Sequence, residues 1–433
     1  MPAGRLFAAL LSGVVAATLL CPASSATAAP PAKRPTYGEV RDLLVKHTKI
    51  VEMTNEAGTG RVIICPEYQG RIMTSTVDGL NSPSQGWVNK AFFDKKEPNK
   101  RFNNYGGEDR LWIGPEGGQF SLWFKPNVEQ NLANWYTPAA LNDGPMPIVS
   151  KDTDPTYRLA RKMQFQNASG TQFNIEVTRE LHMLAELHFG KLFGEEAQSM
   201  LKANGMKMVG FESVNTLTNR GPAMTKEKGL ISLWVVGMFP PGAQTKIILP
   251  IKDGADTTLG PLVKSDYFGE VSSDRLQTTD QAAFFLGDGK FRSKIGLSQK
   301  RARPLAAALD EETNTLTLVH FSMPAEPSDY PYVNNAWKAE QDEPYAGDVV
   351  NAYNDGPPAT GKPSMGGFYE LESLSPAFPL ATNKFLRHIH ATFHVQGPRE
   401  ALIKLAQAAL GVDIPDEGAP LEASDDQAPK SRR

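Results

Sequence analysis

Polar and apolar positions alternate most clearly between residues 385 and 396, FLRHIHATFHVQ. Successive side chains of an extended strand point to opposite faces. One face would therefore carry a mainly polar row: Leu386, His388, His390, Thr392 and His394. The other face is mostly apolar. This pattern predicts a strand with one face packed on a core and an imidazole face that lines water or a cleft.

Short strand-like runs bounded by Gly, Pro, Asn and Asp recur along most of the chain. Clear examples stand at 60–79, 171–184, 206–221, 228–254 and 314–324. Helical patterns are few and stand at 38–47, 194–205 and 398–411, the last beginning at a proline and ending at a glycine. The sequence therefore predicts an all-β protein, a large sandwich or barrel rather than alternating βαβ units.

The two ends of the chain differ from the rest. Arg5, an apolar run at 6–20 and small residues up to Ala28 are typical of a secretory signal peptide. We expect residues 1–28 to be removed, the protein to be secreted or periplasmic, and no integral membrane segment to remain. Cys21 leaves a lipid-anchored start as an alternative.

The remaining chain divides into three parts. Residues 29–49 are expected to form a helical lead-in, and no Pro- or Ser-rich linker interrupts 50–411, which we expect to be one domain. Residues 412–433 are polar and poor in large apolar side chains, so a disordered tail is predicted.

Charge and cysteine content narrow the classes of partner. The 433 residues carry a net charge of −3, which removes any argument for nucleic acid as a partner. After signal cleavage only Cys65 would remain, so an intramolecular disulfide is excluded. We expect a small or neutral partner, and no cofactor.

Two carboxylates precede the histidine-bearing strand. Glu370 and Glu372 lie two residues apart, so an extended chain places them on one face. If this strand pairs with the strand at 385–396, the carboxylates and imidazoles can meet and supply general acid and base groups. Glu372, His388 and His390 are therefore the candidate catalytic residues, and Glu370 and His394 are candidates for substrate binding.

The segment 103–126 mixes paired glycines, charges and aromatic side chains. Sugar sites use this mixture, because aromatic faces cover the apolar C–H surface of a sugar while charged groups hold its hydroxyls. The candidate substrate-binding residues are Tyr105, Glu108, Arg110 and Trp112. A hairpin with a tryptophan-rich core is the alternative.

Two groups could hold a metal ion. The His388/His390 pair could chelate one together with Glu372 or Glu370, although hydrogen bonding and proton transfer explain the pair as well. A second group of oxygen donors could hold Ca²⁺: Asp348, Asn351, Asn354 and Asp355. Its spacing does not match an EF-hand loop, and turn formation also accounts for its Asn and Asp residues. We expect no metal site.

With these residues in view, the chain resembles the galactose mutarotase-like superfamily, which includes the aldose 1-epimerases. Leu371-Glu372-Ser373, followed by Ser375-Pro376 and the strand at 385–396, is similar to the C-terminal part of the epimerases, and Glu372 matches their catalytic base. The runs GDVVNAYNDGPP, GGFYELESLSPA and HIHATFH resemble a group of uncharacterised exported bacterial proteins of that superfamily. The resemblance implies a β-supersandwich of two large antiparallel sheets with a few short helices and a sugar-binding cleft.

The sequence also departs from the epimerases. The region 212–216 has no histidine where the epimerases carry their acid, and Tyr105-Gly106-Gly107 stands where they have His-Gly-Gly. The leading hypothesis is an exported carbohydrate-binding or carbohydrate-active protein, with a mutarotase-like reaction that uses a Glu base and a His acid. Lysis or hydrolysis of a polysaccharide on the same fold is an alternative. A non-catalytic module that binds glycans or a cell-envelope partner is another.

Overall fold

The computed structural model describes residues 34–95, 99–150, 156–358 and 361–415. The expected signal peptide lies outside these residues, as does the tail from residue 416. Helix α1 (Tyr37–His47) lies within the expected lead-in. Val412 and Ile414, just beyond the expected end of the domain, are buried in the hydrophobic cluster beneath the C-terminal helix.

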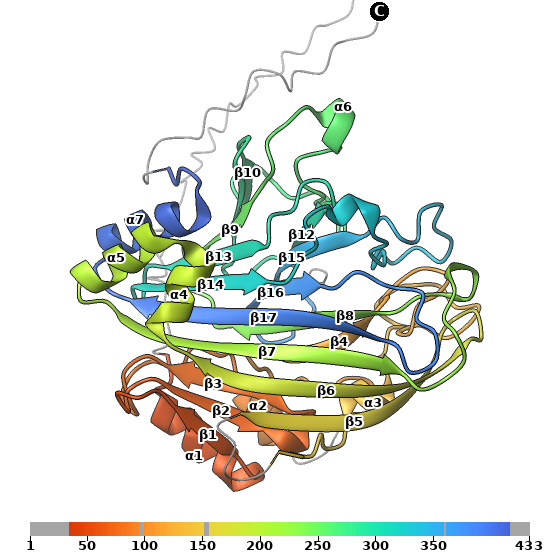
Figure 1. The fold of residues 1–433 in the computed structure, drawn as a ribbon, viewed down its shortest axis with the longest axis horizontal. Coiled ribbons are helices and arrows are strands. Elements are labelled where there is room, and N and C mark those ends of the chain that lie inside the picture. Colours follow the sequence, from red (N-terminus) through yellow and green to blue (C-terminus); the bar gives the residue numbers. More distant parts are fainter. Residues whose placement is uncertain (1–33, 96–98, 151–155, 359–360, 416–433) are drawn as a thin grey trace, which may run out of the picture. The chain divides into compact units, whose positions relative to one another are not determined.

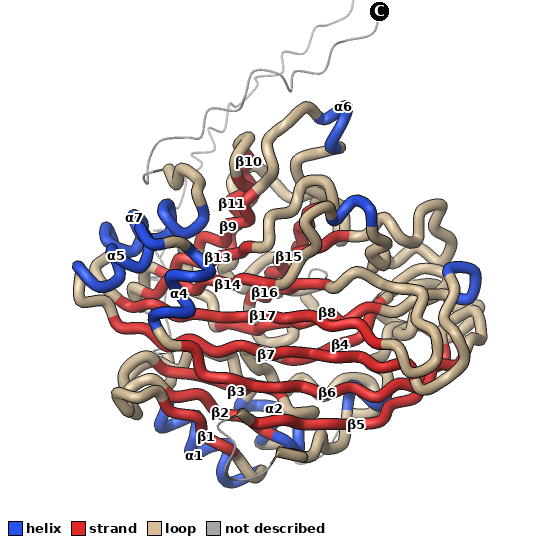
Figure 2. Tube along the Cα trace, viewed as in Figure 1, coloured by secondary structure: helices blue, strands red, loops and turns tan. Residues whose placement is uncertain are grey.

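The strands of the described residues form three antiparallel sheets (Figures 1 and 2). In spatial order, the nine-stranded sheet contains β10 (Leu276–Thr278), β11 (Ala282–Leu286), β9 (Lys246–Pro250), β13 (Leu305–Asp310), β14 (Thr315–Phe321), β17 (Phe385–Gln396), β7 (Lys207–Asn219), β6 (Gln172–Leu184) and β5 (Tyr157–Gln166). The five-stranded sheet contains β12 (Ser293–Ser298), β15 (Asp348–Asn354), β16 (Tyr369–Leu374), β8 (Ser232–Phe239) and β4 (Arg110–Gly114). The third contains β1 (Val51–Thr54), β2 (Arg61–Cys65) and β3 (Arg71–Thr76).

Helices are short and few in the described residues. Besides α1 they are α2 (Lys90–Phe93), α3 (Ala139–Asn142), α4 (Glu186–Phe193), α5 (Glu195–Ala203), α6 (Asp256–Leu259) and α7 (Arg399–Leu410). Single 3₁₀ turns stand at Pro66–Tyr68, Lys226–Lys228 and Pro327–Asp329. The expected all-β fold of two large antiparallel sheets with few helices is confirmed, and a small third sheet accompanies them.

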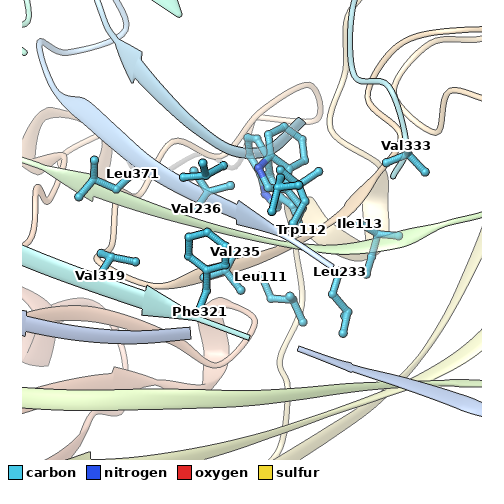
Figure 3. Packing of buried hydrophobic residues seen from close by; sticks show 14 of the residues in the cluster. Leu111, Trp112, Ile113, Leu233, Val235, Val236, Val319, Phe321, Val333 and Leu371 are labelled. Carbon is cyan, nitrogen blue, oxygen red and sulfur yellow. The ribbon is translucent and has the colours of Figure 1, made fainter. Parts of the chain in front are cut away.

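The main core lies between the two larger sheets. Figure 3 shows Leu371 and Val235 of the five-stranded sheet beside Val319 and Phe321 of the nine-stranded sheet. These side chains are at most 1% exposed. Because side chains alternate along each strand, the neighbours of Leu371 on β16, Glu370 and Glu372, point to the opposite face of the five-stranded sheet.

The other face of the nine-stranded sheet is covered by α4, α5 and α7, which lie together in Figure 1. Phe393 of β17 packs there against Phe189 and Phe193 of α4, with ring centroids 5.4 and 5.6 Å apart. Helix α7 begins after Pro398 and ends at Gly411, whose φ of 61° is readily adopted by glycine. The helix boundaries expected from these two residues are confirmed.

The alternation predicted for 385–396 is correct, but this strand does not pair with the strand that carries Glu370 and Glu372. Strand β17 pairs with β14 and β7, whereas β16 pairs with β15 and β8 of the other sheet. The imidazole face of β17 therefore packs into the interior between the sheets. His388, His390 and His394 have no exposed surface, so this face lines neither water nor a cleft.

No helix among the described residues is both long enough and apolar enough to cross a lipid bilayer.

Candidate functional site

A pocket of about 160 Å³ lies against the face of the five-stranded sheet that carries Glu370 and Glu372. Its polar and charged lining consists of Arg110, Glu116, Arg292, Lys294, Tyr353, Asp355, Glu370 and Glu372. Its aromatic lining consists of Phe102, Trp112, Trp135, Trp234, Phe268, Trp337 and Phe368. This combination of an apolar wall and convergent polar groups is typical of small-molecule sites.

Strand register brings the charged residues together. Glu372 of β16 stands opposite Val236 of β8, which in turn stands opposite Arg110 of β4. On the other side, Glu370 pairs with Tyr353 of β15. Tyr353 pairs in turn with Lys294 of β12. Side chains opposite one another in antiparallel strands point to the same face, so five strands contribute to one surface.

Indole rings form much of the pocket wall. The ring centroids of Trp112 and Trp234 are 5.1 Å apart, nearly perpendicular to each other. Trp135 and Trp337 stack at 6.5 Å. Both separations fall within the range of favourable aromatic pairs. The rings therefore support one another as a preformed apolar surface.

Glu372 is held at the base of the pocket by two donors. Its Oε2 atom accepts hydrogen bonds from Nε1 of Trp234 and Nζ of Lys294, each at 2.9 Å. Its Oε1 atom is buried and has no hydrogen-bond partner in the protein. Because a buried carboxylate oxygen without a donor costs free energy, this oxygen is suited to contact a ligand.

Glu370 pairs with Arg110. Nη2 of Arg110 donates to Oε1 of Glu370 at 2.7 Å, and the guanidinium lies 3.9 Å from the Trp112 ring centroid. Burial raises the pKa of the Glu370 carboxyl to about 8, although Arg110 opposes the shift, and the charge of Glu372 raises it further. A carboxyl group with such a pKa carries its proton for much of the time near pH 7.

The remaining carboxylates of the pocket have neutral donors. Oε1 of Glu116 accepts from Nε1 of Trp135 at 2.8 Å. Asp355 accepts from the Tyr353 hydroxyl at 3.1 Å and from two backbone N–H groups, those of Gly366 and Gly367, at 3.0 and 2.9 Å. Burial raises the pKa of both carboxyl groups. Their hydrogen bonds hold neighbouring loops in place at the pocket.

The predicted catalytic histidines lie behind the site. The Ser373 hydroxyl oxygen is 2.8 Å from Nε2 of His388 and 2.8 Å from Nδ1 of His390. Ser373 follows Glu372 on β16 and therefore points into the interior, away from the pocket. Burial lowers the pKa of His388 to about 3 and that of His390 to about 4. These imidazoles therefore do not reach Glu370 and Glu372, which they would have met if β16 and β17 had paired.

His394 and Glu108 also belong to the interior between the sheets. Nε2 of His394 lies 2.8 Å from Oε2 of Glu108, and both side chains are fully buried. Glu108 in addition accepts from the hydroxyl and the backbone N–H of Ser75. This arrangement satisfies Glu108 and His394 away from the pocket, so neither lines it.

Tyr105 lies in another cluster, between α1 and the small sheet. Its ring stacks on Tyr68 with centroids 4.1 Å apart. The pocket thus brings together four of the predicted site residues: Arg110, Trp112, Glu370 and Glu372. It leaves out five: Tyr105, Glu108, His388, His390 and His394.

Several lining residues were missed by sequence reasoning. Trp135 and Trp337 come from long stretches without periodicity, where no pattern indicates which aromatic side chains meet. Lys294 did leave a signal in the sequence, because it stands in the otherwise weakly polar run SKIGLS of β12. In the structure this residue is only 6% exposed. A lysine buried within a strand requires a buried partner, here Glu372.

The oxygen-rich residues at 348–355 are satisfied by protein donors. Nδ2 of Asn351 donates to Asp348 at 3.1 Å, and Nδ2 of Asn354 donates to Asp288 at 3.1 Å. Within the described ranges, no group of three or more His, Cys, Asp and Glu side chains is arranged to hold a metal ion.

The geometry supports both binding and proton transfer. Two carboxyl groups share one wall, and each is hydrogen-bonded to a cation. When the surroundings move the pKa values of two carboxyl groups apart, one group can act as an acid and the other as a base. Among the described residues, no histidine lines the pocket, so acid–base chemistry there would draw on its carboxyl groups, Lys294 or Tyr353.

Solved structures similar to this chain share little sequence with it. A protein of Escherichia coli K12, provisionally described as an aldose 1-epimerase, matches with a TM-score of 0.45 and 13% identity over 81% of this chain and 99% of that chain. A protein of Synechocystis sp. PCC 6803 matches with a TM-score of 0.44 and 13% identity, over 81% and 96%. A provisionally described mutarotase of Salmonella typhimurium matches with a TM-score of 0.37 and 11% identity, over 82% and 98%.

No curated protein sequence matches the chain. A family model does match it, over residues 35–417, which is most of its length. The chain belongs to the family of unknown function DUF6786.

Proposed function

We propose that the pocket on the five-stranded sheet binds a carbohydrate. The observation that supports this most strongly is the conjunction of indole walls with two buried carboxyl–cation pairs, Glu370 with Arg110 and Glu372 with Lys294. Sugars present apolar C–H faces beside hydroxyl groups, so they require aromatic surfaces and charged hydrogen-bonding groups side by side.

The unpaired atoms of the pocket indicate where a ligand would bind. Oε1 of Glu372 and two guanidinium nitrogens of Arg110, Nε and Nη1, lack hydrogen-bond partners in the protein. A ligand hydroxyl can donate to the carboxylate oxygen and accept from the guanidinium. Such contacts would relieve buried unsatisfied groups, which gives a binding free energy that an apolar ligand cannot provide.

The catalytic form of the proposal is a mutarotase-like proton exchange. Glu372 takes the proton of the anomeric hydroxyl through Oε1 while Glu370 gives its proton to the ring oxygen, and the bond between the anomeric carbon and the ring oxygen breaks. The open-chain aldehyde recloses on its other face, and both protons return. Glu370 suits the acid role because its pKa is raised to about 8.

A non-catalytic binding site is the second candidate. One observation favours it: both carboxyl groups already contact a cation, at 2.7 Å for Glu370 and 2.9 Å for Glu372. Such pairs can act as a fixed frame for ligand hydroxyls without moving protons. The two candidates share the ligand class and differ only in anomer exchange.

Tryptophan emission offers a direct test, because four of the six tryptophans line the pocket. The purified chain would be titrated with neutral monosaccharides, uronic acids and short oligosaccharides. We expect a saturable change in emission that Glu372→Gln weakens by about 10-fold or more, as for the loss of a hydrogen bond to a charged group. Glu195→Gln, at an exposed position of α5, is the matched control and should bind as the wild type does.

Anomer exchange then separates the two candidates. Exchange spectroscopy by NMR would follow the interconversion of the anomers of a bound sugar. Acceleration that is lost in both Glu370→Gln and Glu372→Gln supports the enzyme. Binding without acceleration supports the non-catalytic site, and a lack of saturable binding to any sugar contradicts the proposal itself.

Export is proposed on the pattern of residues 1–28 alone. The chain would be released outside the cytoplasm or into a periplasm after cleavage near Ala28. Mass spectrometry of the protein recovered from a fractionated bacterial host checks this. An intact N-terminus in the cytoplasmic fraction contradicts it.

A further inference from the structure

Most of the charged groups that line the pocket form an ion pair or a hydrogen bond within the protein. Glu370 pairs with Arg110, and Glu372 pairs with Lys294. Asp355 accepts from a tyrosine hydroxyl and two backbone N–H groups, and Glu116 accepts from an indole. None of these contacts is made with a further cation that lines the pocket.

Arg292 is that further cation. It directly precedes β12 and lines the pocket two residues before Lys294. Its guanidinium carbon lies 3.7 Å from the ring centroid of Phe268 and 5.6 Å from that of Trp337. Its polar contact in the protein is with the hydroxyl of Tyr353, which is neutral. Arg292 forms no ion pair with any residue that the structure describes.

The stacked guanidinium is arranged for an oxyanion. Stacking on an aromatic face fixes the guanidinium plane and leaves the N–H groups at its edge free for hydrogen bonds in that plane. Two parallel N–H groups match the two oxygens of a carboxylate, sulfate or phosphate. A hydroxyl group offers one oxygen and no charge, so it would leave this half-buried cation uncompensated.

We propose that Arg292 selects sugars that carry an anionic oxygen group: a uronic acid carboxylate, or a sulfate or phosphate ester. This inference rests on the proposed carbohydrate pocket and names the class of sugar that the pocket prefers. The indoles and the Glu370/Glu372 wall would contact the ring, and Arg292 would contact the anionic substituent.

The test compares ligands that differ in one group. Glucose and glucuronate, and galactose and galacturonate, would be titrated at pH 7 by tryptophan emission, with glucose 6-sulfate and glucose 6-phosphate as the ester arms. We expect at least one anionic sugar to bind about 10-fold or more tightly than its neutral counterpart. The arm that binds most tightly identifies the anionic group. Added NaCl should weaken the binding of the anionic sugar more than that of the neutral sugar.

Variants at residue 292 locate the effect. Arg292→Gln should abolish the preference for the anionic sugar over its neutral counterpart, while Arg292→Lys, which keeps the charge but loses the fork, should retain part of the preference. Arg387→Gln, at an exposed position of β17, is the control and should keep the full preference.

The possible outcomes separate this inference from the proposed function. Equal binding of neutral and anionic sugars, or a preference that survives Arg292→Gln, overturns the role of Arg292 and leaves the carbohydrate pocket intact. Failure of both neutral and anionic sugars to bind overturns both.

Discussion

Nζ of Lys294 lies 2.9 Å from Oε2 of Glu372, although the two residues stand on strands separated by β15 and both are almost fully buried. The lysine side chain passes over the sheet to reach the carboxylate, with Nζ 5.1 Å from the Trp234 ring centroid. This contact ties the edge strand β12 to the strand that carries both carboxyl groups of the pocket.

Lys294→Met should therefore destabilise the protein strongly. It leaves Glu372 buried with the indole N–H of Trp234 as its remaining donor, and breaking one side of a buried ion pair typically costs about 3–5 kcal/mol. Urea unfolding, followed by circular dichroism, measures the change in the free energy of unfolding.

The double variant Lys294→Met/Glu372→Gln is the matched control for that prediction. It removes both charges, so most of the lost stability should return. A double variant that is as unstable as the sum of the two single variants would show that the ion pair does not couple the residues.

Glu370→Gln should change how stability depends on pH. Burial raises the pKa of Glu370 from 4.5 to about 8, so its contribution to stability is fully present below about pH 4.5 and is lost as the pH rises through 8. The glutamine variant should gain stability relative to wild type between pH 5 and 8. The gain in the free energy of unfolding should be at most roughly 1.4 kcal/mol for each pH unit in that range. Thermal unfolding across that range measures the difference, and parallel pH profiles would refute the shift.

The buried histidines behind the site should make stability depend on pH in the opposite direction. Burial lowers the pKa values of His388 and His390 from 6.5 to about 3 and 4, so their contribution to stability is present above pH 6.5 and is lost as the pH falls toward these values. His388→Gln/His390→Asn, which places a polar atom near each contact with Ser373, should have a flatter stability profile between pH 6.5 and 4. Acid unfolding of both proteins tests this, and equal slopes would contradict it.

Short strand-like runs bounded by turn residues predicted the all-β class. The alternation along β17 and the bounds of α7 follow from local chemistry: period-2 patterning in the first case, and Pro398 with Gly411 in the second. These features depend on neighbours in the sequence, so they can be inferred from one chain.

Partnership between strands could not be predicted in this way. Only 10 residues separate the end of β16 at Leu374 from the start of β17 at Phe385, and a hairpin between them is the simple expectation. The chain instead crosses from one sheet to the other, which buries His388 and His390 against Ser373. That choice depends on long-range packing, which no local pattern encodes.

The candidate site likewise combines features that the local sequence predicts with features that depend on long-range packing. Glu370 and Glu372 could be assigned to one face because they stand two residues apart, whereas Trp135 and Trp337 reach the pocket from separate loops. The histidine pattern pointed to chemistry because imidazoles often act as acids and bases. In the structure their hydrogen bonds are made within the interior between the sheets.

Saturation-transfer NMR on the intact chain detects the binding of a sugar in the indole-lined pocket, on which both proposed functions depend. With a panel of neutral, uronic and ester-bearing sugars, we predict that at least one sugar receives saturation from the protein, strongest at the C–H protons of one face of its ring, and that Glu372→Gln reduces this signal while Glu195→Gln does not. No saturation of any sugar, or a signal unchanged in Glu372→Gln, would contradict the account.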